Sequence, residues 1–158
     1  MYWISAIWER TGDFKVAAEC AREVWFKHGD TITPLCAEAC KIDVKTVHDV
    51  HKAIMMMPDA GTKSRNHPNL TQSIDMHQTS EHENHHRAWC DSCMWLTTME
   101  ELGQEEHIEF LCSVLCQPVY ANYVRSLLPG VKVTALKTPP RKSKGEVPVC
   151  EWEAVLEK

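Results

Sequence analysis

The feature that most constrains the fold of this chain is a change in hydrophobic periodicity after residue 57. Before that point apolar residues recur at three- and four-residue steps, which is typical of amphipathic helices. The spacing predicts helices over residues 13–28, 33–40 and 43–57. Gly29 is expected to end the first helix, Pro34 to lie in the first turn of the second, and Asp43 to cap the third.

Beyond residue 57 the pattern becomes richer in strands. Polar and turn-forming residues over 58–69 predict a loop. The elements expected after it are strands over 70–79 and 83–90, a helix over 93–102 that ends at Gly103, a long helix over 104–128 kinked at Pro118, and a hairpin with strands over 131–138 and 147–155. This order predicts an α+β fold: N-terminal helices, then a mainly antiparallel sheet with a long helix packed on it.

Length, charge and hydropathy narrow the class of protein. The 158 residues are expected to form a single domain over 1–158, with a helical part over 1–57 and a strand-rich part over 70–158. A net charge of -5 without a basic stripe argues against nucleic-acid binding. No apolar run approaches the ~20 residues of a membrane span, and MYWISAIWER lacks the basic region of a signal peptide. We therefore expect a cytoplasmic protein, and a homo-oligomer stays open.

The stretch HENHHRAWCDSCMW, residues 82–95, concentrates chemically active side chains. On a strand, His86, Ala88 and Cys90 would face one way, because side chains alternate. His86 and Cys90 would then lie roughly 13 Å apart, too far to share a metal ion. We expect the histidines of this stretch to lie on a solvated or ligand-facing strand.

Cys90 and Cys93 form a C-x-x-C motif, which can hold a metal ion or close a disulfide. If Asp91 or Ser92 caps the following helix, Cys93 lies in its first turn. The backbone amides there would lower its pKa below the ordinary ~8.5 and make it a nucleophile. Both cysteines could instead be small apolar side chains in the core.

Cys112 and Cys116 lie one turn apart on the apolar face of the predicted long helix. At this spacing their β-carbons are ~6 Å apart, so both could point into one pocket, although core packing explains them equally well. Cys150 is expected to complete the set. We expect these sulfurs to gather around a common hollow between the sheet and the long helix.

Four segments of the C-terminal half carry a resemblance to a known family: HRAWCDSCMWLTTMEELG, EFLCSVLC, SLLPGVKVTALKT and KGEVPVCEWEAV. Their order resembles the L-2-amino-thiazoline-4-carboxylate hydrolase family and, more distantly, vinyl-reductase-type ligand-binding domains. The recurring positions are a cysteine that ends a strand, a cysteine on a helix, and a glycine followed by Cys150 and Trp152. The resemblance implies a cytoplasmic α+β domain that holds a small polar molecule and hydrolyses a carbon–nitrogen bond of a thiazoline ring.

The leading hypothesis is therefore a small-molecule hydrolase or lyase in which Cys93 attacks an electrophilic carbon. His86 or Glu109 would manage protons, and Cys112 would line the same pocket. The ligand-binding residues expected around it are Trp89, Trp95, Tyr120, Tyr123 and Cys150.

Three alternatives stay open. Thiolates of Cys90, Cys93, Cys112 and Cys116 suit zinc or an iron–sulfur cluster. The C-x-x-C pair alone suits a thioredoxin-like redox centre. A domain that binds a small molecule without catalysis is the third.

Overall fold

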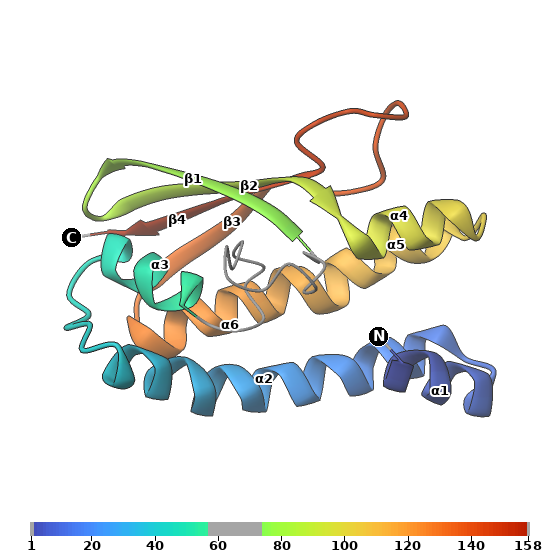
Figure 1. Cartoon of the computed structure of the whole chain (residues 1–158), viewed down its shortest axis with the longest axis horizontal. Helices are drawn as coiled ribbons and strands as arrows, with labels where there is room; N and C mark the ends of the chain where they lie inside the picture. Colours follow the sequence, from blue (N-terminus) through green and yellow to red (C-terminus); the bar gives the residue numbers. More distant parts are fainter. Residues whose placement is uncertain (1, 57–73, 158) are drawn as a thin grey trace, which may run out of the picture.

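The computed structural model describes residues 2–56 and 74–157 and has an α+β fold (Figure 1). The loop predicted over 58–69 lies outside the described residues. The elements are α1 (Tyr2–Thr11), α2 (Phe14–Ala39), α3 (Val47–Met55), β1 (Ile74–His82), β2 (His85–Cys93), α4 (Met94–Glu101), α5 (Glu105–Leu111), the π-helical turn η1 (Cys112–Cys116), α6 (Gln117–Leu127), β3 (Val131–Lys137) and β4 (Cys150–Leu156).

The described strands form one antiparallel sheet in the order β1-β2-β4-β3. Both strand pairs expected from the sequence are present, and β2 and β4 join them at the centre. In this central pair His86 is opposite Ala154, and Cys90 is opposite Cys150. Cys90 and Cys150, which the sequence assigned to two separate strand pairs, are therefore neighbours in the sheet.

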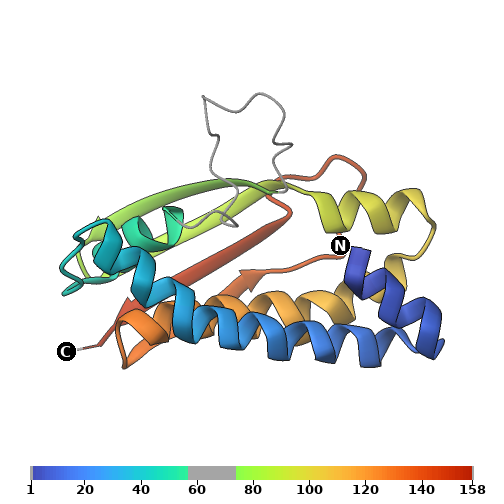
Figure 2. The same cartoon turned by 60° about the horizontal axis from the view of Figure 1, so that its bottom comes forward.

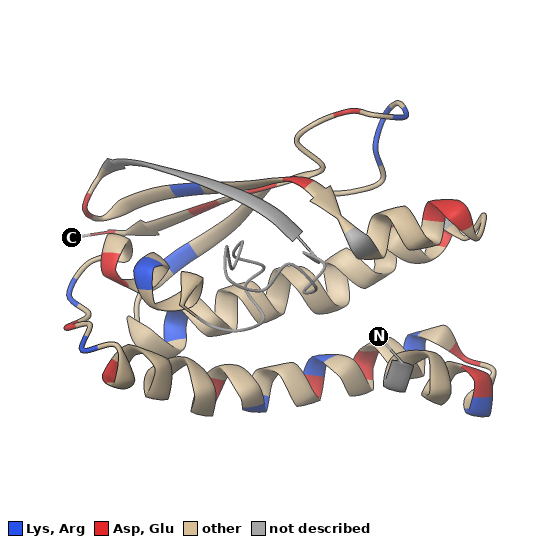
Figure 3. Cartoon of the chain, in the orientation of Figure 1, with Lys and Arg blue, Asp and Glu red and all other residues tan. Residues whose placement is uncertain are grey.

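Helices cover one face of the sheet. α6 packs against β3 on one side and against α2 on the other, and α3 lies beside β2 and β4 (Figures 1 and 2). Figure 3 shows that η1 and α6, which form the middle layer, carry almost no charged residues; Arg125 is the exception. The opposite face of the sheet is polar, where Arg87 pairs with Glu151 at 2.7 Å and His85 with Glu153 at 2.9 Å.

The prediction that Gly29 ends the first helix is wrong, because α2 continues through Gly29 and Pro34 to Ala39. Gly29 is buried against α6, and a β-carbon at this position would lie 2.5 Å from Tyr123 Cδ1. The glycine thus allows two helices to approach closely. Tertiary packing keeps the helix intact, and Pro34 removes only one backbone hydrogen bond from it.

The start of the third helix also differs from the prediction. Thr46, not Asp43, caps α3 through a reciprocal capping box: Thr46 Oγ1 accepts from the amide of Asp49 at 3.2 Å, and Asp49 Oδ2 accepts from the amide of Thr46 at 3.1 Å. Asp43 instead forms an exposed ion pair with Lys45 at 2.5 Å.

The predicted long helix is interrupted by a π-helical turn, whereas the sequence predicted a kink at Pro118. Between α5 and α6 the backbone forms the π-helical turn η1, in which the amide of Gln117 donates to the carbonyl of Cys112. Pro118 follows in the first turn of α6, directly after this π-helical turn. The turn holds one more residue than an α-helical turn would.

Candidate functional site

Five cysteines from three parts of the chain meet on the inner face of the sheet. Two come from β2 and the start of α4, two from η1 and one from β4; they are Cys90, Cys93, Cys112, Cys116 and Cys150. All five belong to, or pack against, one hydrophobic cluster that includes Ile108, Leu111 and Leu115. The described part of the chain holds no disulfide, so each is a free thiol.

A β-bulge turns Cys93 toward this cluster. In the ladder between β1 and β2, Ser92 is opposite Asp75 and Cys90 is opposite Met76, which leaves Asp91 as the extra residue. Without the bulge, simple alternation would direct Cys93 and Cys90 to opposite faces of the sheet. Cys90 is buried, 3% exposed, and Cys93 is half-buried.

Cys90 and Cys150 are partners in the ladder between β2 and β4, and their contact moves the two pKa values in opposite directions. The contact with Cys90, ahead of the opposing effect of burial, lowers the pKa of Cys150. Trp152 Nε1 donates to the same sulfur at 3.3 Å. The pKa of Cys90 is raised, first by its contact with Cys150 and then by burial. If one of these two thiols ionises, it is Cys150.

The expectation for Cys93 is reversed. Burial raises the pKa of the Cys93 thiol to about 11, although the amides of Leu96 and Trp95 at the start of α4 act in the opposite direction. Cys93 is itself the N-terminal cap residue of α4, and Asp91 and Ser92 still belong to β2. The amides at the start of α4 do stabilise the Cys93 thiolate, but the loss of its hydration on burial destabilises it by more.

Cys112 and Cys116 contact each other across the π-helical turn. Cys116 donates a hydrogen bond to Cys112, and this bond together with burial raises the pKa of Cys116 well above its ordinary value. Cys116 is therefore a protonated thiol that packs against the same hydrophobic cluster.

A tyrosine and two histidines extend from the cysteines along the inner face of the sheet. Tyr120 on α6 lies against Trp152, with ring centroids 5.5 Å apart, and its hydroxyl is 2.5 Å from Nε2 of His51 on α3. The His51 ring stacks on His86 of β2 at 3.5 Å between centroids, and its Nδ1 is 3.1 Å from the carbonyl of Val47.

The electrostatics of this row keep it uncharged at neutral pH. Burial lowers the pKa of His51 to about 4, and burial together with the neighbouring histidines lowers that of His86 to about 3. Burial is the largest cause of the raised pKa of Tyr120, so its hydroxyl stays protonated. Neutral His51 thus donates to Val47 through Nδ1 and accepts the Tyr120 hydroxyl hydrogen at Nε2.

Other residues expected at the site lie elsewhere. Glu109 is exposed on α5, and Trp89 lies on the polar face of the sheet, opposite Glu151 in the ladder. Tyr123 belongs to a second hydrophobic cluster and contacts His28 Nδ1 at 3.1 Å. Trp95 does pack against the cysteine cluster, as expected for a wall residue.

His51 is a site residue that the sequence prediction missed. It lies one turn from both Val47 and Ile54 on the apolar face of α3, and it is 2% exposed. A histidine within an apolar helical stripe is the signal that could have identified it, because such a ring needs polar partners when buried.

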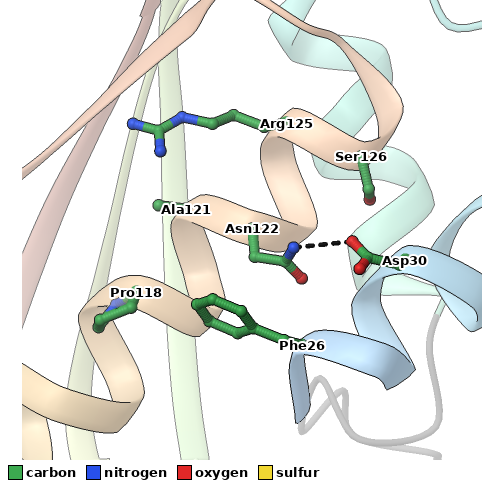
Figure 4. A pocket seen from close by; sticks show the side chains of 7 residues that line it. All are labelled: Phe26, Asp30, Pro118, Ala121, Asn122, Arg125 and Ser126. Atoms are coloured by element: carbon green, nitrogen blue, oxygen red, sulfur yellow. Dashed lines mark hydrogen bonds between the residues drawn. The ribbon is translucent and has the colours of Figure 1, made fainter. Parts of the chain in front are cut away.

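Two cavities in the described part of the chain lie apart from the cysteines. One, of about 350 Å³, lies between α2 and α6 and is lined by Phe26, Asp30, Pro118, Ala121, Asn122, Arg125 and Ser126 (Figure 4). The other, of about 420 Å³, lies beside α1 and is lined by Ser5, Trp8, Glu9, Gly12, Leu102 and Gln104. The hollow expected among the sulfurs is neither of these.

The metal alternative gains no support from the arrangement of side chains. Within residues 2–56 and 74–157 no group of three or more His, Cys, Asp or Glu residues is placed to hold a metal ion. Cys112 and Cys116 contact each other as that alternative expected, but Cys90 pairs with Cys150 and not with Cys93.

The fold and site together define an α+β chain with a buried cluster of thiols beside a neutral tyrosine–histidine row. Comparison of the sequence and structure with models of protein families, with curated proteins and with solved structures gave no match. Among the described residues, no helix is both long enough and apolar enough to span a membrane.

Proposed function

We propose that this protein is a cysteine-dependent hydrolase or lyase that acts on a carbon–nitrogen bond of a small, thiazoline-like molecule, with Cys150 as the nucleophile in place of Cys93. The observation that carries the proposal is the hydrogen bond that the Cys150 sulfur accepts from Trp152 Nε1 at 3.3 Å. This bond, together with the contact with Cys90, lowers the pKa of Cys150 and so favours a thiolate, the form of cysteine that attacks carbon.

In this mechanism the Cys150 thiolate adds to the electrophilic carbon, and a carbon–sulfur bond forms while the carbon–nitrogen bond breaks. Water gives a proton to the leaving nitrogen, and the resulting hydroxide cleaves the carbon–sulfur bond and restores the thiolate. Tyr120 and His51 remain neutral and orient polar groups of the substrate. His86 stacks behind His51 as a positioning residue.

The proposed substrate class and the proposed cytoplasmic location both come from the sequence. The resemblance to thiazoline-carboxylate hydrolases supplies the substrate class. A cytoplasmic location supplies the reducing conditions in which the Cys150 thiol persists.

The test is an assay of ring opening with 2-amino-thiazoline-4-carboxylate, followed by chromatographic separation of the products. Cys150→Ser is expected to lower the rate at least about a hundredfold, because a hydroxyl is a far weaker nucleophile than a thiolate at neutral pH. Cys93→Ser is the matched control from the same cluster and should retain most of the rate.

Two results would contradict the proposal. If the wild-type protein opens no thiazoline ring, the substrate class is wrong. If Cys150→Ser remains active while Cys93→Ser loses activity, the nucleophile is Cys93.

A further inference from the structure

The central strand pair places two thiols in the geometry of a disulfide. Cys90 and Cys150 are direct partners in the antiparallel ladder between β2 and β4. Such partners have α-carbons about 4.5–5.5 Å apart, which lies within the range of about 4.4–6.8 Å that a disulfide spans. Both side chains point to the inner face of the sheet from facing positions of the ladder, so bond formation needs no change in strand register.

The two sulfurs differ in exposure to solvent, and this difference indicates which of them an oxidant reaches first. Cys150 is half-buried, whereas Cys90 is 3% exposed. The Cys150 sulfur accepts a hydrogen bond from Trp152 Nε1 at 3.3 Å. A small oxidant from solvent would therefore meet Cys150 first, with Cys90 directly behind it.

We propose that Cys150 and Cys90 form a peroxide-reducing thiol pair whose product is a disulfide between the two central strands. The Cys150 thiolate attacks the terminal oxygen of a small hydroperoxide, the oxygen–oxygen bond breaks, and the leaving alkoxide or hydroxide takes a proton from water. Cys150 is thereby oxidised to a sulfenic acid, and the peroxide is reduced.

In the second step the disulfide between Cys90 and Cys150 forms. The Cys90 sulfur attacks the sulfur of Cys150, a sulfur–sulfur bond forms, and the sulfenic hydroxyl leaves as water with the proton of Cys90. A low-molecular-weight dithiol then restores both thiols by exchange and is itself oxidised to a disulfide. This activity shares Cys150 with the proposed hydrolase but does not rest on it, and it would switch hydrolysis off while the disulfide persists.

The experiment adds one equivalent of hydrogen peroxide to the reduced, folded full-length protein in the absence of any thiazoline. Remaining thiols are then alkylated, and the unreduced protein is digested with an endopeptidase that cleaves after glutamate. The cleavage pattern separates the candidates: Cys90 and Cys93 lie in 84–100, Cys112 and Cys116 in 110–146, and Cys150 in 147–151.

The expected result is the loss of two of the eight thiols and a linked pair of peptides, 84–100 with 147–151, whose fragmentation places the bond at Cys90. Cys90→Ser should leave Cys150 as a sulfenic acid that a 1,3-diketone reagent traps. Cys150→Ser should slow peroxide consumption at least about tenfold. Cys112→Ser is the matched control and should leave the linkage unchanged.

Three results would overturn the inference: a linkage between other cysteines, a linkage that forms only after unfolding, or peroxide consumption equal in the wild type and Cys150→Ser. Circular dichroism of each variant confirms that it is folded. Since the assay contains no substrate for hydrolysis, its failure leaves the proposed hydrolase untouched, and a failed ring-opening assay leaves the thiol pair untouched.

Discussion

Cys150 and Trp152 are two residues apart on β4, so both side chains point to the inner face of the sheet. The indole N–H donates to the Cys150 sulfur at 3.3 Å. Replacing Trp152 with Phe keeps the ring and removes this donor, so the pKa of Cys150 should rise. Because such a bond contributes about 1 kcal/mol, thiolate reactions of Cys150 near pH 7 should slow by about three- to tenfold.

The measurement is the rate of alkylation of peptide 147–151 in the folded protein as a function of pH. Trp95→Phe is the control, because Trp95 packs against the same cluster and is at the start of α4 rather than on β4. An unchanged pH profile in Trp152→Phe would show that the indole does not stabilise the thiolate.

For single residues, the sequence predicts which side chains share a face of one element better than it predicts their pKa values. Alternation along a strand correctly places His86 and Cys90 on one face, but the expectation of a solvated strand is wrong for His86, which is buried under α3 at 2% exposure. The direction of the Cys93 pKa could not be predicted in this way, because burial by η1 and α4 outweighs the nearby amides. The partner of Cys90 was also hidden, since the register of β2 against β4 depends on segments far apart in the chain.

At the scale of elements, Gly29 determines how closely α2 approaches α6. Helix propensity alone predicts that Gly29→Ala stabilises α2 by about 1 kcal/mol. The structure predicts the opposite sign, because the new methyl group would lie 2.5 Å from Tyr123 Cδ1. Overpacking of this kind costs about 1–3 kcal/mol, so the free energy of unfolding should fall.

Urea unfolding of Gly29→Ala measures this change, with Glu23→Ala, exposed on the same helix, as the control. A more stable Gly29→Ala protein would mean that the two helices have room to separate. The same contact explains why local signals mispredicted α2: Gly29 and Pro34 are stop signals in an isolated segment, but packing against α6 maintains the helix across both.

At the scale of the whole molecule, the stacked rings of His51 and His86 join α3 to the central strand, and Tyr120 adds α6. The pKa values of the two histidines are lowered from 6.5 to about 4 and about 3. Below pH 6.5 the unfolded chain therefore binds more protons than the folded one. Stability should be full above pH 6.5 and should decline as the pH falls from 6.5 to about 4 for His51 and to about 3 for His86, by about 3 kcal/mol from His51 alone.

Urea unfolding between pH 7 and pH 4 measures this decline. His86→Phe keeps an aromatic ring in the stack and removes one titrating group, so its stability should depend less on pH. His82→Phe, at the exposed last residue of β1, is the control. Equal stability of the wild type at pH 7 and pH 4 would contradict the assignment of two neutral buried rings.

The α+β class and the two strand pairs could be predicted because they follow from periodicity within short segments. The convergence of helix and strand residues on one site could be only partly predicted, since His51 enters it from α3, far from the cysteines in sequence. The single domain over 1–158 and the oligomeric state stay predictions.

The π-helical turn η1 has a consequence for any chain of different length in this region. A regular α-helix rotates by about 100° per residue, whereas η1 closes its hydrogen bond over five residues and so holds one more residue within about the same rotation. Deleting one residue between Cys112 and Cys116 should therefore restore regular helix and leave Tyr120 at nearly the same angular position, facing His51. A single missing codon here would change the wall of the sulfur cluster and spare the alignment of α6 with the imidazoles.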